Sequence, residues 1–446
     1  MNHLILARRW IVLNHTVVRM QKPRQIAADI LCERAEGADF VESITERLLA
    51  HSQIAGADRG FVVEIVYGVV RWQATLDELI LMRTEGRTQK ETLRILLRMG
   101  LYQILWLDRV PDHAAVHETV ELAKQLGFGP QSGFINAILR HYTREKGATH
   151  ALLERWKVEK PAVGHSHPLW LVERWQKRWG VDLCGRLLED NNDPSKVFAR
   201  RNSLAVSADD LEKAWAEAGV KAVSRSFDWV GDRIVYEFES APAVASLPGF
   251  AEGWFYVQDP STLLAASQME VRPGMTVLDL CAAPGGKATM LAQLMGDEGL
   301  VVAEDSDPMR LRWVEENSLR LRLKSIRVGP GEPGVLYDAV LVDAPCSNTG
   351  VMRRRVDLRW RIQEPEILRL ALEQADILHT ASLRVKPGGT LVYSTCSIEV
   401  EENQLVAKAF VRSHPEYVMD SERELVPFSG NCDGAYVATL KRRAVM

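Results

Sequence analysis

The sequence predicts a multidomain protein with an all-α N-terminal bundle, a small α+β subdomain and a C-terminal α/β domain built on a doubly wound sheet. Three observations support this fold class. A chain of 446 residues exceeds what one hydrophobic core holds. Residues 21–147 carry apolar side chains only at helical spacing, and from residue 270 onward strands alternate with helices. Residues 148–269 mix both patterns.

Residues 1–20 mix apolar side chains with Arg8, Arg9 and Arg19. A secretory signal would have a cleaner apolar stretch and a small-residue cleavage site, and this segment has neither. We therefore expect an extension that is disordered or that precedes a start at Met20.

In residues 21–147, the spacing of apolar side chains predicts a series of consecutive helices. Residues 39–50 place their apolar side chains on a single stripe, and residues 91–107 repeat the pattern with a denser apolar face. No strand alternation intervenes, so the segment is expected to be a helical bundle of ordinary domain size.

Residues 148–269 predict a linker subdomain. Residues 167–180 form an amphipathic pattern containing Trp170, Trp175 and Trp179. Two strand candidates, 195–202 and 233–239, flank a helical stretch with Ser207 as its N-cap.

Residues 270–446 predict the doubly wound parallel sheet, because continuous apolar strands separated by helices indicate a sheet buried on both faces. The expected strands are 275–280, 299–305, 325–329, 337–345 and 388–397. Ligands bind such sheets beyond the carboxyl ends of the strands, where the strand order reverses. The residues whose side chains could take part in binding or catalysis all follow the carboxyl ends of these strands.

The composition excludes several classes of protein. No apolar run reaches the roughly 18 residues that a membrane span needs. The six cysteines form no CxxC pair and no zinc-type spacing, so we expect free thiols, no metal and a cytoplasmic location. The net charge of −4 does not indicate nucleic acid by itself, so RNA binding would require a local basic surface.

The stretch "VLDLCAAPGGKATML", residues 277–291, predicts a cofactor loop between a strand and a helix. A phosphate-binding P-loop would need Ser or Thr where Ala288 stands, and the GxGxxG of a dinucleotide site is absent. The third interpretation is the S-adenosylmethionine (SAM) loop of Rossmann-like methyltransferases. Asp305, at the end of the next strand, favours it, because an acid there can bind a ribose diol.

Two cysteines follow strands at the same predicted edge, Cys346 in "DAPCSNTG" and Cys396 in "YSTCSIEVEEN", and Asp343 precedes the first. Each thiol alone is more often a buried apolar group than a catalyst. Together with a SAM loop and an acid, they indicate methylation of a carbon that is not itself nucleophilic. A thiolate that adds to C6 of a pyrimidine makes C5 able to accept a methyl group.

These three motifs resemble the RNA cytosine-C5 methyltransferases of the Nop/Sun superfamily. The helical front end, with "DRGFVVEIVYGVVRW" and "SGFINAILR", resembles the NusB-like RNA-binding domain of the bacterial Sun (RsmB-type) enzymes. The resemblance extends from about Gln21 to Arg443. It implies methylation of a cytosine in small-subunit (16S) ribosomal RNA.

The resemblance also implies roles for individual residues. Cys396 would be the nucleophile, Cys346 would assist product release, and Asp343 would bond the N3/N4 edge of the cytosine. Lys287 would lie near the reaction centre, and Asp305 would bind the ribose of SAM. The cofactor loop would be formed by Cys281, Ala282, Ala283, Pro284, Gly285, Gly286 and Lys287, with Asp343 beside it.

The chain departs from the family pattern beyond the third strand, where Pro330 replaces the usual acid. Adenine would then be held by backbone alone or by Glu332. Arginines crowd the stretch after Cys346 and predict a phosphate-binding surface. They are Arg353, Arg354, Arg355, Arg359 and Arg361.

The expected partner is RNA, unassembled small-subunit rRNA above all, bound by a monomer without membrane or metal. Because the target base must leave its stack, a single-stranded or loop region is the favoured substrate. Two alternatives stay open: the same chemistry on transfer RNA, and a non-catalytic RNA-binding assembly factor with a degenerate methyltransferase fold. We expect the domains to be 21–147 (NusB-like), 148–269 (linker) and 270–446 (methyltransferase).

Overall fold

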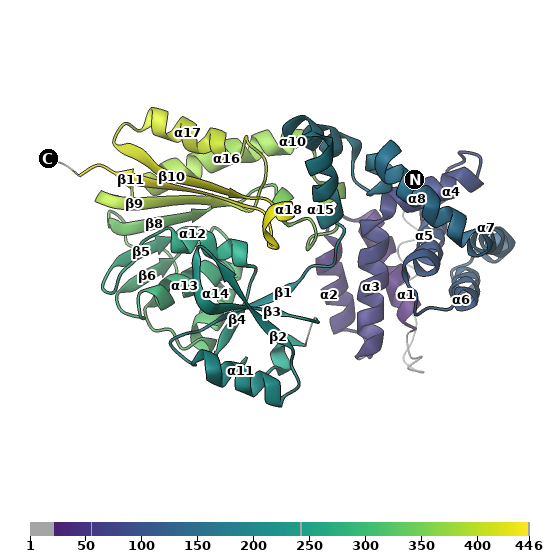
Figure 1. The fold of residues 1–446 in the computed structure, drawn as a ribbon, viewed down its shortest axis with the longest axis horizontal. Helices are drawn as coiled ribbons and strands as arrows, with labels where there is room; N and C mark the ends of the chain where they lie inside the picture. The colour runs from purple at the N-terminus through teal and green to yellow at the C-terminus, as the bar shows by residue number, and fades with distance from the viewer. Residues whose placement is uncertain (1–21, 55, 241–242, 445–446) are drawn as a thin grey trace, which may run out of the picture. The chain divides into compact units, whose positions relative to one another are not determined.

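The computed structural model describes residues 22–54, 56–240 and 243–444, and the chain divides into two compact units, Met1–Ser166 and His167–Met446 (Figure 1). The extension expected at residues 1–20 lies outside the described residues.

The first unit is helical, as predicted. Its helices are α1 (Pro23–Glu36), α2 (Val41–Ala50), α3 (Ala57–Arg71), α4 (Gln73–Arg83), α5 (Glu91–Trp106), α6 (Asp112–Gln125), α7 (Ser132–Arg144), α8 (Lys146–Glu159) and α9 (Pro161–Gly164). Helix α5 is buried along most of its length and packs against α1, α3, α4, α6 and α7. A helix that is apolar on nearly every side belongs at the centre of a bundle.

The second unit begins with α10 (Leu169–Asp190) and a small domain of strands and one helix, which confirms the α+β fold predicted between the bundle and the C-terminal sheet. Its strands β1 (Val197–Arg201), β2 (Ala222–Phe227), β3 (Val230–Phe238) and β4 (Phe255–Val257) form an antiparallel sheet in the order β2-β3-β1-β4. Helix α11 (Ala208–Glu217) starts at Ser207, whose hydroxyl accepts a hydrogen bond from the Asp210 N–H. Trp215 of α11 packs on Tyr236 and Phe255 of the sheet.

The C-terminal sheet has seven strands in the order β10-β11-β9-β8-β5-β6-β7. The strands are β5 (Thr276–Asp279), β6 (Leu300–Ala303), β7 (Ile326–Val328), β8 (Tyr337–Asp343), β9 (Val385–Thr395), β10 (Tyr417–Leu425) and β11 (Ala435–Arg442). β5 to β9 are parallel, as predicted, whereas β11 runs antiparallel to both β9 and β10. The chain order reverses between β5 and β8, so a ligand site is expected beyond the ends of these two strands.

The sheet has an apolar core on each face, and helices cover both faces (Figure 1). Helices α12 (Leu263–Ser267), α13 (Gly286–Leu294) and α14 (Pro308–Arg320) cover one face, through side chains such as Leu264, Leu291 and Val314. Helices α16 (Glu364–Ser382) and α17 (Gln404–Ser413) cover the other, through Leu378 and Phe410. Burial on both faces explains the apolar runs inside these strands, Val277–Leu278 in β5, Val301–Ala303 in β6 and Ala339–Val342 in β8.

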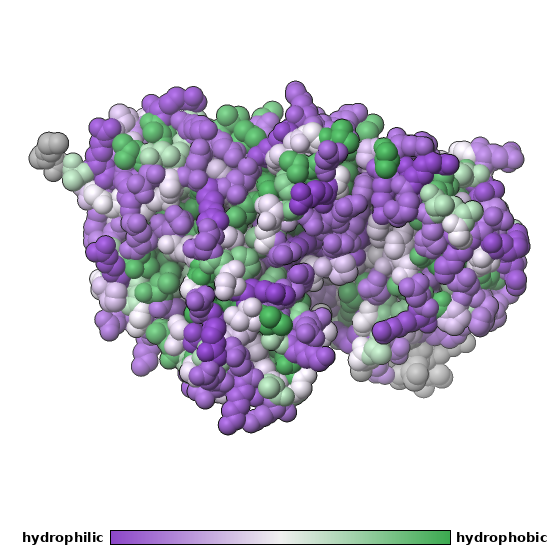
Figure 2. Space-filling model, in the orientation of Figure 1, coloured by the Kyte–Doolittle hydropathy of each residue, from purple (hydrophilic) through white to green (hydrophobic). Residues whose placement is uncertain are grey.

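Within the described ranges, no helix is both long and apolar enough to cross a membrane. On the face shown in Figure 2, hydrophilic residues predominate and hydrophobic ones lie in small groups.

Candidate active site

The predicted cofactor loop, Cys281–Lys287, connects β5 to α13, which begins at Gly286. Side chains at its two glycines would be in tight contact with their neighbours. Gly285 has φ +103°, and a Cβ there would lie 3.2 Å from the Cα of Val314, while one at Gly286 would lie 3.2 Å from the Tyr256 ring. Only a residue without a Cβ adopts such a conformation at low cost, so the loop presents backbone, which suits close approach of a ligand.

Asp305 lies beside this loop, just beyond the end of β6. Its carboxylate accepts hydrogen bonds from the backbone N–H of Ala283 at 3.2 Å and of Asp307 at 3.1 Å. The neighbouring Glu304 faces elsewhere and pairs with Arg384 at 2.8 Å. Of the two acids at this strand end, Asp305 is thus the one in contact with the loop.

The segment after β7 carries Pro330 where an acid was expected, and Pro330 is exposed. Glu332 is paired with Arg327 at 3.0 Å, and its side chain is 71% exposed. The N–H of Gly331 donates to Glu304 Oε1 at 2.6 Å, which fixes the backbone near the end of β6.

Lys287 and Asp343 form an ion pair, with Nζ 2.5 Å from Oδ2, and the Ser394 hydroxyl donates to Asp343 Oδ1 at 2.8 Å. Burial, the largest single effect, would lower the pKa of Lys287, but the charge and hydrogen bond of Asp343 together with the nearby Asp279 and Cys396 outweigh it and raise that pKa. Lys287 therefore stays positive at neutral pH, between the cofactor loop and the end of β8.

Asp279 ends β5 beneath this pair and is fully buried. Neither of its carboxylate oxygens meets a hydrogen-bond donor among the described residues. Burial, reinforced by the charge of Asp343 and only partly offset by Lys287, raises the pKa of Asp279 to about 7. A buried acceptor without a donor costs free energy, which a ligand that donates a hydrogen bond would recover.

The two cysteines that follow β8 and β9 are adjacent, with Sγ of Cys346 3.3 Å from Sγ of Cys396. The thiol of Cys396 also donates to Asn348 Oδ1 at 3.0 Å. Because each thiol has one proton, this leaves Cys346 as the donor to Cys396. The hydrogen bond to Cys396 and burial raise the pKa of Cys346 well above its ordinary value, so this thiol keeps its proton at neutral pH.

A third group at this end of the sheet was missed by the sequence analysis. Glu402 is fully buried and bonds Ser347 and Ser397, the residues that follow the two cysteines. The only signal in the sequence was an acid near Cys396 in "IEVEEN", which reads equally well as the polar start of the next helix. The contact depends on how two loops fold toward each other.

The predicted phosphate-binding role of the arginines after Cys346 is wrong for Arg353 and Arg359, which are buried, while Arg354 is half-buried and ion-paired. Arg353 is buried, with its Nε 2.6 Å from Asp433 Oδ1, and Arg354 donates to Asp259 at 2.6 Å. Arg359 is 0% exposed and donates to the Asn191 carbonyl at 2.9 Å. These guanidinium groups are used in internal pairs that hold the loop in place.

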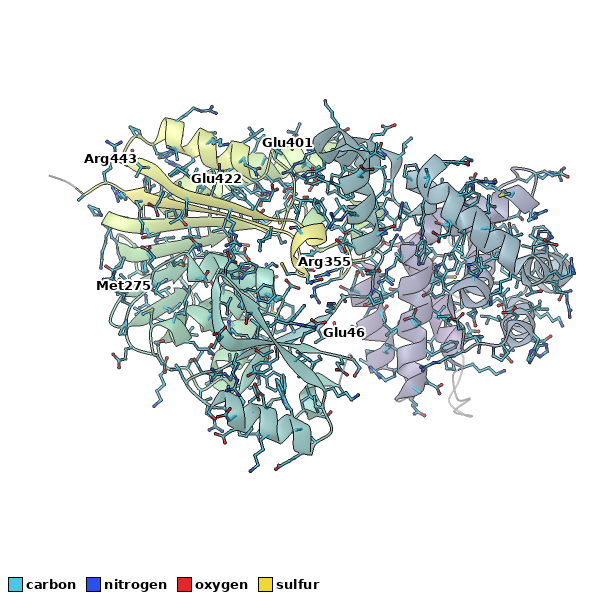
Figure 3. All side chains as sticks on the ribbon, in the orientation of Figure 1. Glu46, Met275, Arg355, Glu401, Glu422 and Arg443 are labelled. Atoms are coloured by element: carbon cyan, nitrogen blue, oxygen red, sulfur yellow. The ribbon has the colours of Figure 1, made fainter. Side chains whose placement is uncertain are left out.

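Arg355 differs from its neighbours because it is exposed. It comes from the segment that follows β8, and Glu401 from the segment that follows β9 (Figure 3).

The residues present fit SAM. The glycine loop provides a backbone cradle that a Cβ would fill, Asp305 provides a carboxylate beside it, and Asp279 provides buried acceptors without donors. A parallel sheet with β11 inserted antiparallel, a glycine loop after its first strand and an acid after the second define a Rossmann-like methyltransferase.

Comparison with known proteins narrows this class. The model for "16S rRNA methyltransferase RsmB/F" matches residues 266–441. The NusB family model matches residues 21–144, and a model described as Methyltr_RsmF/B-like, ferredoxin-like domain, matches residues 167–229. The ribosomal RNA small subunit methyltransferase B of Vibrio cholerae is 34% identical over 426 residues, covering 91% of this chain and 94% of that protein. The chain belongs to the RsmB/F family of 16S rRNA methyltransferases.

Other similar proteins agree with this assignment. The ribosomal RNA small subunit methyltransferase B of Vibrio vulnificus is 34% identical over 439 residues, covering 94% of this chain and 99% of that protein. The crystal structure of PH0851 shares the fold, with a TM-score of 0.76 at 24% identity, and covers 96% of this chain and 100% of that one. A methyltransferase homologue from Pyrococcus horikoshii matches with a TM-score of 0.55 at 26% identity, over 63% of this chain and 97% of that one.

Proposed function

We propose that this protein transfers a methyl group from SAM to C5 of a cytosine in small-subunit (16S) rRNA, through a covalent adduct between Cys396 and C6 of the base. The observation that carries the proposal is the pair of thiols 3.3 Å apart, next to the Lys287–Asp343 ion pair and the cofactor loop. Most methyl acceptors are nucleophiles already, so paired thiols at a cofactor loop indicate a carbon acceptor.

The nucleophile in this proposal is Cys396. Its sulfur would give up a proton and form a bond to C6, and the electron pair displaced from the C5–C6 double bond would make C5 nucleophilic. Bound SAM would supply an electrophilic methyl group to that carbon. A base then removes the C5 proton, the double bond re-forms, and the Cys396 sulfur leaves as a thiolate that takes up a proton again.

Asp343 and Lys287 would act on the base and its surroundings. Asp343 lies one strand end away from Cys396, where its carboxylate can bond the N3/N4 edge of a cytosine. Lys287 holds that carboxylate, and because its charge interacts with Cys396 it would stabilise negative charge that develops on the sulfur during the reaction.

Cys346 would assist release of the product. Because its pKa is raised well above the ordinary value, it remains a thiol and can donate a hydrogen bond or a proton to the sulfur of Cys396 as that sulfur leaves. A thiol that stays neutral is poorly suited to be the nucleophile. This supports the assignment of different roles to the two cysteines.

The SAM site would use Gly285 and Gly286 for close approach and Asp305 for the ribose. Asp279 has acceptors free for a donor such as the ammonium of the methionine end. With Pro330 in place of an acid and Glu332 paired with Arg327, we propose that adenine is held by backbone groups.

We propose that residues 21–147 bind the RNA, that 148–269 link the two functions and that 270–446 carry the chemistry, in a monomer that acts in the cytoplasm on unassembled rRNA. The target base would leave its stack to reach Cys396. Exposed Arg355 beyond β8 is the side chain of the basic stretch best placed to contact phosphate.

The test is incubation with SAM labelled in its methyl group and, separately, with deproteinised small-subunit rRNA and with bulk tRNA, each from cells lacking the enzyme. The proposal expects label in 5-methylcytidine of the rRNA. Label in tRNA alone would favour the tRNA alternative, and RNA binding without label would favour the assembly factor.

A further inference from the structure

Glu402 lies between the loops that carry the two cysteines and is in contact with both. Its Oε1 accepts hydrogen bonds from the backbone N–H of Ser347 at 2.8 Å and from Gln374 Nε2 at 3.0 Å. Its Oε2 accepts the hydroxyl protons of Ser347 and Ser397. Ser347 directly follows Cys346, and Ser397 directly follows Cys396, so one carboxylate joins the residues next to both thiols.

Further hydrogen bonds hold the backbone of Glu402 and of the two loops around its carboxylate. The Tyr393 hydroxyl donates to the Glu402 carbonyl at 2.5 Å. Gln374 of α16 donates to the Pro345 carbonyl at 2.9 Å as well as to Glu402, and Asn403 Nδ2 donates to the Ser397 carbonyl at 2.9 Å. A carboxylate has about four acceptor positions, and this geometry uses four donors without a cation.

We propose that Glu402 is a positioning residue that fixes the distance between the nucleophilic thiol of Cys396 and the thiol of Cys346. The expected effect of Glu402 on methylation rests on the proposed function, whereas its effect on the spacing of the two sulfur atoms does not. The two loops that carry the thiols cannot move apart unless charge-assisted hydrogen bonds between Glu402 and one of the two serines break, and such bonds are about twice as strong as neutral ones.

An exclusively structural role for Glu402 is the competing explanation, and the two differ in what they expect. A structural role affects folding and all ligand binding together. A positioning role affects the distance between two sulfur atoms, and through it the steps in which both thiols take part, while SAM binding at the loop after β5 is preserved.

The first experiment measures the thiol spacing without any reaction on RNA. The whole protein is treated with diamide, which accepts two electrons and two protons as two thiols become a disulfide, and the Cys346–Cys396 disulfide is followed by peptide mapping. The positioning role expects E402A to form it about tenfold more slowly than wild type, with E402Q between the two. The neighbouring E401Q, which removes a charge that contacts Arg174, serves as the control and should match wild type.

Because E402A can fail to fold, S397A provides a second variant, which removes the hydrogen bond from Ser397 to Glu402 and keeps the carboxylate. Disulfide formation in folded S397A or E402A at the wild-type rate would overturn the proposal. The wild-type spacing can be tested in this way even if the protein methylates no RNA.

The second experiment uses rRNA and SAM. The positioning role expects kcat to fall about tenfold in S397A and about 100-fold in E402A, with the Kd for SAM changed by less than about twofold. Loss of SAM binding in parallel with kcat would indicate an exclusively structural role and overturn the inference. Absence of methylation by wild type would instead contradict the proposed function and leave the disulfide result to decide the spacing.

Discussion

Cys346 and Cys396 lie 50 residues apart in the chain and 3.3 Å apart at their sulfur atoms. The parallel pairing of β8 with β9 brings them together, because Asp343 at the end of β8 pairs with Ser394 near the end of β9. The hydrogen-bond order, from Cys346 to Cys396 and from Cys396 to Asn348, makes the two thiols chemically different.

This difference predicts opposite consequences for two alanine substitutions. C396A should abolish methylation because the nucleophile is lost, and it should form no adduct. C346A should form the adduct but release it slowly, so an RNA–protein band resistant to denaturation should accumulate on a gel. C32A in α1, far along the chain from both thiols, serves as the control and should behave as wild type.

Substantial turnover by C396A would contradict its role as nucleophile. A C346A reaction that methylates RNA and leaves no adduct band would count against the release role of Cys346.

The Lys287–Asp343 ion pair predicts a second effect. K287M should leave a carboxylate without its cation beside Asp279 and remove positive charge from the thiol site. Iodoacetamide should then alkylate Cys396 more slowly, and kcat should fall by at least about tenfold. Alkylation is followed by mass spectrometry of the Cys396 peptide. An unchanged alkylation rate in folded K287M would show that Lys287 does not act on the sulfur.

Because the pKa of Asp279 is raised, we expect this residue to make the stability of the protein fall as the pH rises. Its folded pKa is raised to about 7, whereas the unfolded chain loses this proton near pH 4. Its contribution to stability is therefore fully present below about pH 4 and is lost as the pH rises through 7. Relative to wild type, D279N without cofactor should gain about 3 kcal/mol in free energy of unfolding between pH 5 and pH 8.

D338N is the matched control in chemical denaturation. Burial alone would raise the pKa of Asp338, but hydrogen bonds from Lys386 and Thr276 lower it overall. Its stabilising contribution is present above its ordinary pKa and is lost only in acid, so the effect of D338N should be the same at pH 5 and pH 8. If D279N also changed the free energy of unfolding by the same amount at pH 5 and pH 8, this would contradict the raised pKa of Asp279.

Exposed Arg355 predicts a change in the salt dependence of RNA binding. R355A should weaken binding, and the slope of log K against log salt should become shallower by about 0.7 to 0.9, as expected for one lost phosphate contact. Fluorescence anisotropy over a salt series measures this slope. R369A, on the exposed face of α16 where Arg369 pairs with Glu366 and Glu373, is the control. Equal slopes for R355A and wild type would exclude a phosphate contact.

Much of the fold could be predicted from the sequence, because the periodicity of apolar residues reports directly on burial. The helical front end and the five parallel strands are of this kind. Strands β10 and β11 were not predicted. β10, "YVMDSEREL", has five consecutive polar residues, Asp420 to Glu424, and lies at the sheet edge. An edge strand has one neighbour and needs no continuous apolar run.

Parts of the site formed by one continuous segment, such as the glycine-containing cofactor loop Cys281–Lys287, could be predicted from the sequence. The site was not predictable where charges pair over long distances in the chain. Arg353 and Arg354 read as a basic surface, yet Asp433 pairs with Arg353 from 80 residues away and Asp259 pairs with Arg354 from 95 residues away. Glu402 was missed for the same reason, because its partners beside Cys346 are 55 residues away.

The central claim is that Cys396 forms the covalent bond to the RNA. Its most direct test is mass spectrometry of the adduct formed by C346A with small-subunit rRNA and SAM, after digestion with trypsin and nucleases. If Cys396 is the nucleophile, a methylated cytidine nucleotide will be attached to the peptide that contains Cys396. Attachment to any other residue, or 5-methylcytidine formed by the C396A variant, would contradict it.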